Sequence, residues 1–284
     1  MRKISLLFAT CLILAACGAP GSLSGRNGGG SQPEASAQRY RGTGTVLEEK
    51  GAEPVLCLGV VMESLPPQCG GPRIAGWNWD DVSGEESATG TTWGDFEVTG
   101  LYDGDTFTLI EAAPPRRQDV EDDSITSRCP KPPRGWERPD PDLTSEVDQL
   151  RAINAARREP DFAGAWIDYI DEPTEFTDPT DTVLNLAFTD DLDRHEREIR
   201  RDWGGPLCVT EHERTLERLH EIQAELSGTA GQELGLEVLS SDSSENRNVV
   251  ELGVVVLDAA TQQEIDDRYG DGTVEINAQL EPVP

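Results

Sequence analysis

Apolar and polar residues alternate over short runs in the stretch 40–112, a pattern typical of half-buried strands. The strand-like runs are residues 42–47, 55–61, 96–102 and 105–110. The last two runs flank the pair Asp103-Gly104, and an Asp-Gly pair favours a tight hairpin because glycine adopts the positive φ that the turn needs. We therefore expect residues 40–112 to form a small β-domain, either a barrel or a sandwich.

The period of the apolar positions changes in residues 143–284, where strand and helix patterns alternate. Strands are expected near residues 162–170, 183–188, 207–211, 236–240, 249–257 and 273–280. Helices are expected near residues 145–158, 190–203, 215–226 and 258–269. Thr144 or Ser145 and Asp258 are suited to cap helix N-termini, and Gly270 is suited to end the last helix.

A weak internal repeat relates two parts of this region at an offset of 66 residues. Five identities support it: Val183 with Val249, Leu186 with Leu252, Glu198 with Glu264, Ile199 with Ile265, and Gly204 with Gly270. The repeated order is strand, helix, turn and strand. The sequence thus predicts an α+β protein in which a small disulfide-linked β-domain precedes a duplicated α/β domain of the αββαβ kind.

The N-terminus has the pattern of an export signal. Arg2 and Lys3 precede an apolar run over residues 4–16, which is too short to span a bilayer of about 30 Å. The run ends in Leu-Ala-Ala before Cys17, which resembles the bacterial lipobox. That resemblance implies cleavage before Cys17, its lipidation (palmitate among the acyl chains), and anchoring to the extracytoplasmic face of the cell membrane. An ordinary signal peptide with an incidental cysteine is the alternative.

Two further segments have compositions typical of connectors. After the signal peptide (1–16), residues 17–39 are rich in Gly, Ser, Pro and Ala and indicate a flexible, lipidated tether. Residues 113–142 contain seven prolines, which interrupt helices and sheet ladders, and so indicate a linker. The expected domains are then 40–112 and 143–284.

Six cysteines occur in the chain, and an exported protein favours their pairing. Cys11 leaves with the signal peptide and Cys17 takes the lipid, so Cys57, Cys69, Cys129 and Cys208 remain. Of the three possible pairings, we favour Cys57–Cys69 within the β-domain and Cys129–Cys208 between the linker and the second domain. A metal site is the alternative, but the cysteine spacing does not fit one.

The negative charge of the chain argues against nucleic-acid binding and against charge-driven association with an anionic membrane. The chain has 24 Lys and Arg against 54 Asp and Glu, a formal net charge of -30. Nucleic-acid binding requires clustered basic residues, so no nucleic-acid partner is expected. An anionic lipid surface would repel this chain, and membrane association must therefore come from the N-terminal lipid.

Motifs of catalysis and cofactor binding are missing from the sequence. Each of the three histidines, His195, His212 and His220, is followed by Glu, as in zinc proteases. That motif needs a second His four residues after the first, and these positions hold Ile199, Leu216 and Ala224. No nucleophile elbow, phosphate-binding loop or EF-hand spacing occurs either. We expect no enzymatic activity, no cofactor, no catalytic residue and no metal ligand.

Residues 161–193 contain ten acidic residues and no Lys or Arg. A solvated, self-repelling surface is the simplest interpretation. Weak Ca²⁺ binding or docking of a basic protein or peptide is the alternative.

Part of the second domain resembles a known family. Residues 162–168 (FAGAWID), 214–219 (RTLERL) and 248–256 (NVVELGVVV) are similar to the pro-segments of secreted streptogrisin and α-lytic-type serine proteases. Those pro-segments are duplicated α/β units that template and inhibit the protease. No protease sequence follows within these 284 residues, so the resemblance implies the fold and not the activity. As a whole, the chain resembles surface lipoproteins of actinobacteria.

These observations favour a non-enzymatic, lipid-anchored envelope protein that binds a protein or peptide, with a basic partner favoured by charge. Two alternatives stay open: an envelope hydrolase that uses unidentified carboxylates, and a lipoprotein that binds Ca²⁺ or a small ligand.

Overall fold

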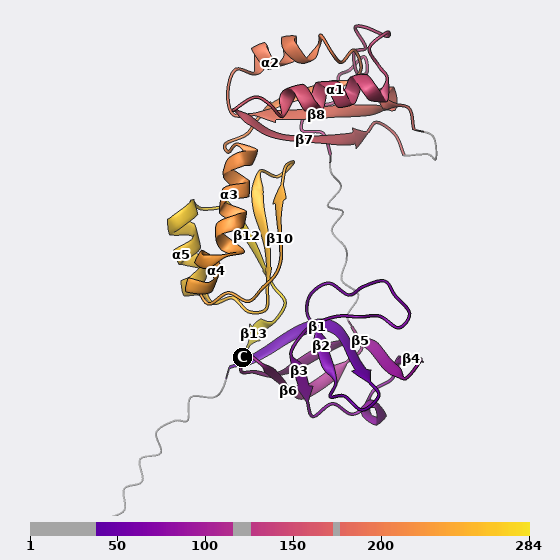
Figure 1. Cartoon of the computed structure of the whole chain (residues 1–284), viewed down its shortest axis with the longest axis vertical. Helices are drawn as coiled ribbons and strands as arrows, with labels where there is room; N and C mark the ends of the chain where they lie inside the picture. The colour runs from indigo at the N-terminus through magenta and orange to yellow at the C-terminus, as the bar shows by residue number, and fades with distance from the viewer. Residues whose placement is uncertain (1–37, 116–125, 173–176) are drawn as a thin grey trace, which may run out of the picture. The chain divides into compact units, whose positions relative to one another are not determined.

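The computed structural model describes residues 38–115, 126–172 and 177–284 (Figure 1). The described residues all belong to one compact unit of the chain. The described part is a mixed α+β structure with three sheets and five α-helices. The expected signal peptide and most of the expected tether lie outside the described residues.

The first sheet has seven strands in the order β13-β1-β2-β3-β6-β5-β4. The strands are β1 (Arg39–Glu49), β2 (Val55–Cys57), β3 (Arg73–Ala75), β4 (Glu86–Ala88), β5 (Thr91–Tyr102), β6 (Thr106–Ala113) and β13 (Glu281–Val283). β1 pairs with β2 and also along its whole length with β5, and β3 runs parallel to β6. The predicted hairpin is confirmed, because β5 and β6 are antiparallel partners joined at Asp103-Gly104, where Gly104 has a φ of 103°.

The core of this sheet comes from the apolar positions of its alternating strands. Val46, Phe96, Val98 and Phe107 are almost fully buried in it. The aromatic rings of Trp77 and Trp79, the latter in the short 3-10 helix η1 (Trp79–Asp81), pack against it at its edge.

The second sheet has the order β7-β8-β9 and follows α1. Its elements are α1 (Glu146–Ala156), β7 (Phe162–Tyr169), the 3-10 helix η2 (Pro179–Asp181), β8 (Thr182–Phe188), α2 (Leu192–Ile199) and β9 (Leu207–Glu211). Ser145 caps α1 in a capping box with Asp148, as its position before the helix predicts. Figure 1 shows α1 and α2 on one face of β7 and β8, where Leu184, Leu186 and Phe188 are fully buried.

α2 ends at Ile199, earlier than the expected residue 203. The four residues that follow form a turn that buries Trp203 completely. A Cβ atom on Gly204 would lie only 1.9 Å from the backbone oxygen of Asp140, so the chain after α2 packs directly against another backbone segment. This close approach, which periodicity does not reveal, turns the chain away from the helix axis.

The third sheet has the order β10-β11-β12. Its elements are α3 (Leu216–Leu226), α4 (Thr229–Glu233), β10 (Val238–Ser244), β11 (Val249–Val254), α5 (Ala259–Tyr269) and β12 (Val274–Ala278). Thr215 and Asp258 cap α3 and α5, and Gly270 ends α5 with a φ of 97°. The apolar residues Leu219, Ile222, Leu226 and Ile265 of these helices pack on the sheet.

The second and third sheets share one pairing scheme. In each, the first strand is antiparallel to the second, and the second is parallel to the third. Asn185 of β8 pairs with Cys208, and Glu251 of β11 pairs with Glu275. Asn185 and Glu251 are 66 residues apart, which is the offset of the internal repeat.

The C-terminus of the chain returns to the first sheet. After β12 the chain continues into β13, which pairs with β1 of the first sheet. Leu280 and Val255 are buried in the core of that sheet. The last residues of the chain therefore complete the first sheet, a non-local pairing that no sequence pattern indicates.

Candidate functional site

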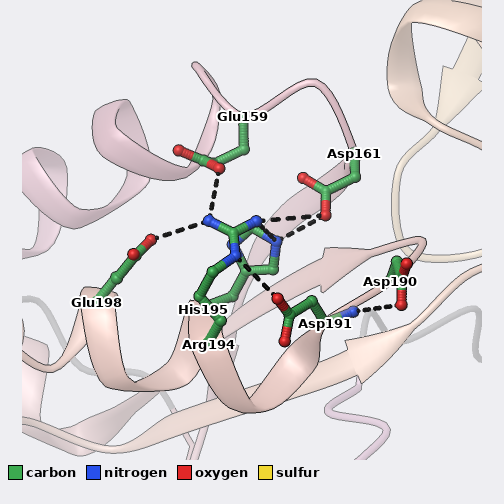
Figure 2. Close-up of polar contacts among 7 residues, drawn as sticks. All are labelled: Glu159, Asp161, Asp190, Asp191, Arg194, His195 and Glu198. Carbon is green, nitrogen blue, oxygen red and sulfur yellow. Dashed lines mark hydrogen bonds and ion pairs between the residues drawn. The ribbon is translucent and has the colours of Figure 1, made fainter.

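Carboxylates meet a histidine where the loop between α1 and β7 contacts α2 (Figure 2). Glu159, Asp161 and His195 bring possible ligand atoms within 4.8 Å of one another. The Nε2 atom of His195 lies 2.7 Å from an Asp161 carboxylate oxygen, and the imidazole ring stacks on Phe188 at 3.7 Å between ring centroids. His195 is buried by this packing. By residue type, the group could ligate a metal ion or orient a catalytic base.

Arg194 occupies the centre of this group in Figure 2. Its Nη1 atom donates hydrogen bonds to Glu159 at 2.9 Å and to Glu198 at 3.1 Å, and its Nε atom donates to Asp191 at 3.1 Å. The bond to Glu159 is the largest cause that raises the pKa of Arg194 above its ordinary value. The guanidinium is thus the cation that these carboxylates surround, and a metal ion would have to displace it.

The contacts of His195 show how this histidine is held within the cluster. The Nε2 atom of His195 bonds to Asp161 and lies 2.9 Å from an Arg194 nitrogen, while Phe188 covers one face of its ring. No described Ser, Thr or Cys hydrogen-bonds to this histidine, so no nucleophile is placed for activation. The arrangement is an ion-pair network that fastens α2 to the loop before β7.

A second polar group lies on the face of the second sheet that α1 and α2 leave free. His212 is buried there, and both of its ring nitrogens lack a hydrogen-bond partner. Its ring stacks on Trp166 with 5.8 Å between centroids and an angle of 13° between planes. Burial lowers the pKa of His212 to about 4, and the nearby charge of Arg128 acts in the same direction. The imidazole is therefore neutral at neutral pH.

Residues 126–129, which we call the strap, cross this same face. The backbone N–H of Ser127 donates to Asp168 at 2.8 Å, and the indole N–H of Trp166 donates to the backbone oxygen of Thr126 at 3.2 Å. The disulfide Cys129–Cys208 fixes the end of the strap to β9. The strap explains why this face is buried although no helix covers it.

Two adjoining grooves lie beside the strap and the third sheet. The first groove encloses about 700 Å³ and is lined by Thr126, Arg128, Ala165, Trp166, Glu251 and residues 242–247, which are the end of β10 and the turn after it. The second groove encloses about 670 Å³ along the third sheet and shares Asp242, Arg247 and Glu251 with the first. The β10–β11 turn meets β7 closely, since Glu245 accepts a hydrogen bond from the backbone N–H of Ala165 at 2.7 Å.

Polar side chains of both charges line these grooves. Arg247 donates to Glu251 at 3.1 Å and forms a second ion pair with Glu275. All three side chains stay about two-fifths exposed, with values of 40%, 41% and 43%. The grooves can therefore exchange hydrogen bonds and charge contacts with a ligand, and they offer it more polar than apolar surface.

The cysteine sites predicted from sequence are placed as follows. The structure contains the disulfides Cys57–Cys69 and Cys129–Cys208, the pairing that we favoured. Cys17 lies outside the described residues. No helix in the described ranges is long and apolar enough to cross a membrane.

The described acidic residues of the stretch 161–193 are divided among several places: Asp161 and Asp191 pair with Arg194, and others lie elsewhere. Asp168 accepts the bond from the strap, and Asp178 caps η2, where bonds from Thr180 lower its pKa. Asp181 pairs with Arg138 at 3.5 Å.

The sequence analysis did not predict the central place of Arg194 or the stacking of Trp166 on His212. The polar residues Asn185 and Thr210, which lie in mainly apolar strands, were a signal that one face of the sheet is polar.

Comparison with known proteins finds no matching family model and no matching protein among those that have been curated. The function must therefore be argued from the residues and the geometry.

Proposed function

We propose that this chain is a lipid-anchored protein of the cell envelope that binds a protein or peptide and catalyses no reaction. The observation that carries the proposal is the first groove, where Arg128, Arg247 and Glu251 offer polar contacts of both charges in about 700 Å³. A peptide backbone needs such donors and acceptors along its length, whereas an apolar small ligand would leave them unsatisfied.

The placement in the envelope rests on two independent features. The export pattern before Cys17 indicates a lipid anchor on the extracytoplasmic side. The two disulfides agree with an oxidising compartment, because cytoplasmic thiols are kept reduced.

We infer a finer architecture from the strand pairing. Because β1 pairs with both β2 and β5, the first sheet returns on itself as a small barrel. The second and third sheets, with one pairing scheme and an offset of 66 residues, are copies of a duplicated αββαβ unit.

The alternative functions have less support in the geometry. The described residues contain one group in which carboxylates and a histidine converge, and the guanidinium of Arg194 already occupies its centre. We therefore expect no heat in a calorimetric titration of the full chain with millimolar Ca²⁺. A saturable heat would favour the ion-binding alternative.

Two measurements test the proposal. Mass spectrometry of the membrane fraction should find acyl chains on Cys17, and Cys17→Ala should release the protein. The full chain, purified in detergent, should enrich specific sequences from a random peptide display library. Trp166→Ala/Arg128→Gln should lose this enrichment, while Trp93→Ala/Arg134→Gln, which alters residues outside the groove, should keep it. A library that yields no enriched sequence would contradict the binding function.

A further inference from the structure

The shared pairing scheme of the second and third sheets allows their helix-free faces to be compared position by position. In the second sheet, Trp166, Asn185 and Cys208 lie side by side across the three strands. They are only 8%, 0% and 1% exposed, because the strap lies over them.

The equivalent face of the third sheet is uncovered. Asp242, Glu251 and Glu275 occupy the matching positions, opposite one another across β10, β11 and β12. Glu251 and Glu275 are 41% and 43% exposed, and Asp242 is exposed as well. We call this surface the open face and define it by residues on its three strands: Ser240, Asp242, Glu251, Gly253, Glu275 and Asn277.

Three adjacent carboxylates repel one another, and like charges directly opposite in a sheet are unfavourable. Arg247 compensates two of them through its ion pairs with Glu251 and Glu275. The described contacts give Asp242 no cation, so the row keeps an excess of negative charge in a chain whose net charge is already -30.

We propose that the open face binds an extended, basic segment of a partner protein, which would cover it as the strap covers the equivalent face of the second sheet. This inference rests on the proposed binding function and names the chemistry of the partner. Neighbouring strands lie about 4.8 Å apart, so the row of carboxylates spans about 10 Å. An extended segment that runs across the strands places side chains i and i+2 about 7 Å apart, which lets Lys or Arg reach both ends of the row.

Other occupants fit less well. A second copy of this chain would bring a net charge of -30 against the row. An apolar segment would find mainly polar side chains, and the Ser240 hydroxyl lies against Gly253 where an apolar side chain would have to fit.

The test uses the full chain in detergent and two fluorescent peptides of about ten residues, one alternating Lys with Ser and one alternating Glu with Ser. Fluorescence anisotropy at about 50 mM salt should show binding of the Lys peptide alone, and added salt should weaken it. Asp242→Asn/Glu275→Gln should weaken binding about tenfold or more, as expected when two charge contacts are lost. Asn277→Lys, which adds a positive charge at the rim of the face, should also weaken it.

The matched control is Asp193→Asn/Glu264→Gln, which removes the same charge from exposed positions on α2 and α5. It should bind the Lys peptide within about twofold of the native chain. Equal binding by the two double variants would overturn the open face while leaving the proposed function intact. The same holds if the Lys peptide does not bind but the display library still yields ligands. Failure of every peptide, including those of the library, would contradict both proposals.

Discussion

At the scale of single residues, burial decides the chemistry of the polar groups more than residue type does. His195 and His212 are both buried, yet the first bonds to Asp161 while the second has no hydrogen-bond partner. Arg194 is central in the carboxylate cluster because it satisfies charges that would otherwise repel one another. Each of these roles depends on neighbours that are distant in the sequence.

His212 should make the stability of the fold depend on pH. Its pKa falls from an ordinary 6.5 in the unfolded chain to about 4 in the folded protein, so the unfolded chain binds the proton more readily. The stabilisation is complete above pH 6.5 and is lost as the pH falls towards 4. The free energy of unfolding of the native chain should drop by up to about 3 kcal/mol more than that of His212→Gln over this window.

Urea unfolding at a series of pH values between these limits measures the difference. His220→Gln is the control, because it makes the same substitution at an exposed histidine. Coinciding pH profiles for the native chain and His212→Gln would show that His212 is not held neutral.

At the scale of elements, capping residues set where helices begin, and the Cys129–Cys208 disulfide helps to hold the strap on the second sheet. Ser145, Thr215 and Asp258 begin their helices by accepting backbone hydrogen bonds, and each is a residue type favoured at that position. The strap is different, because its backbone is held by Asp168, by Trp166 and by the Cys129–Cys208 disulfide. It behaves as an added layer on the second sheet.

Removing the Cys129–Cys208 disulfide should cost more stability than removing Cys57–Cys69. The two bonds close loops with sequence separations of 79 and 12, and a longer loop restricts the unfolded chain more strongly. Double Cys→Ala variants should lower the free energy of unfolding by about 4 and about 3 kcal/mol respectively.

The pKa of His212 gives a second way to compare the two disulfide variants, because the strap covers this histidine. In Cys129→Ala/Cys208→Ala, the freed strap should admit water to His212 and move its pKa back towards 6.5, which NMR of the imidazole signals measures. In Cys57→Ala/Cys69→Ala the pKa should stay low. An unchanged pKa in both variants would mean that the strap does not bury this histidine.

At the scale of the whole molecule, the C-terminus is the feature that joins distant parts of the chain. β13 pairs with β1, and Leu280 is completely buried in the core that Val46 and Phe96 form. Residues from both ends of the described chain thus stabilise the first sheet together.

Leu280→Ala should therefore destabilise the protein although it lies only four residues from the C-terminus. The lost burial and the cavity should lower the free energy of unfolding by about 2–5 kcal/mol in urea titration. Val60→Ala, at a position that is 75% exposed, should change it by less than about 0.5 kcal/mol. A similar small effect for Leu280→Ala would contradict its place in the core.

Sequence alone was sufficient for features that depend on near neighbours. Periodicity located most strands and helices, the caps located helix starts, Asp103-Gly104 located a hairpin, and an even number of cysteines in an export context indicated two disulfides. Such signals are local because they arise from backbone conformation and from the spacing of side chains on one element.

Tertiary structure decided everything that depends on strand pairing between distant segments. It brought β13 to β1, laid the strap over Trp166, and aligned Asp242, Glu251 and Glu275 on the open face. The register between two strands depends on how the whole sheet packs against its neighbours. It therefore cannot be read from the pattern of residues within one strand. The sequence therefore determined which elements form, and only the folded chain determined which charges meet.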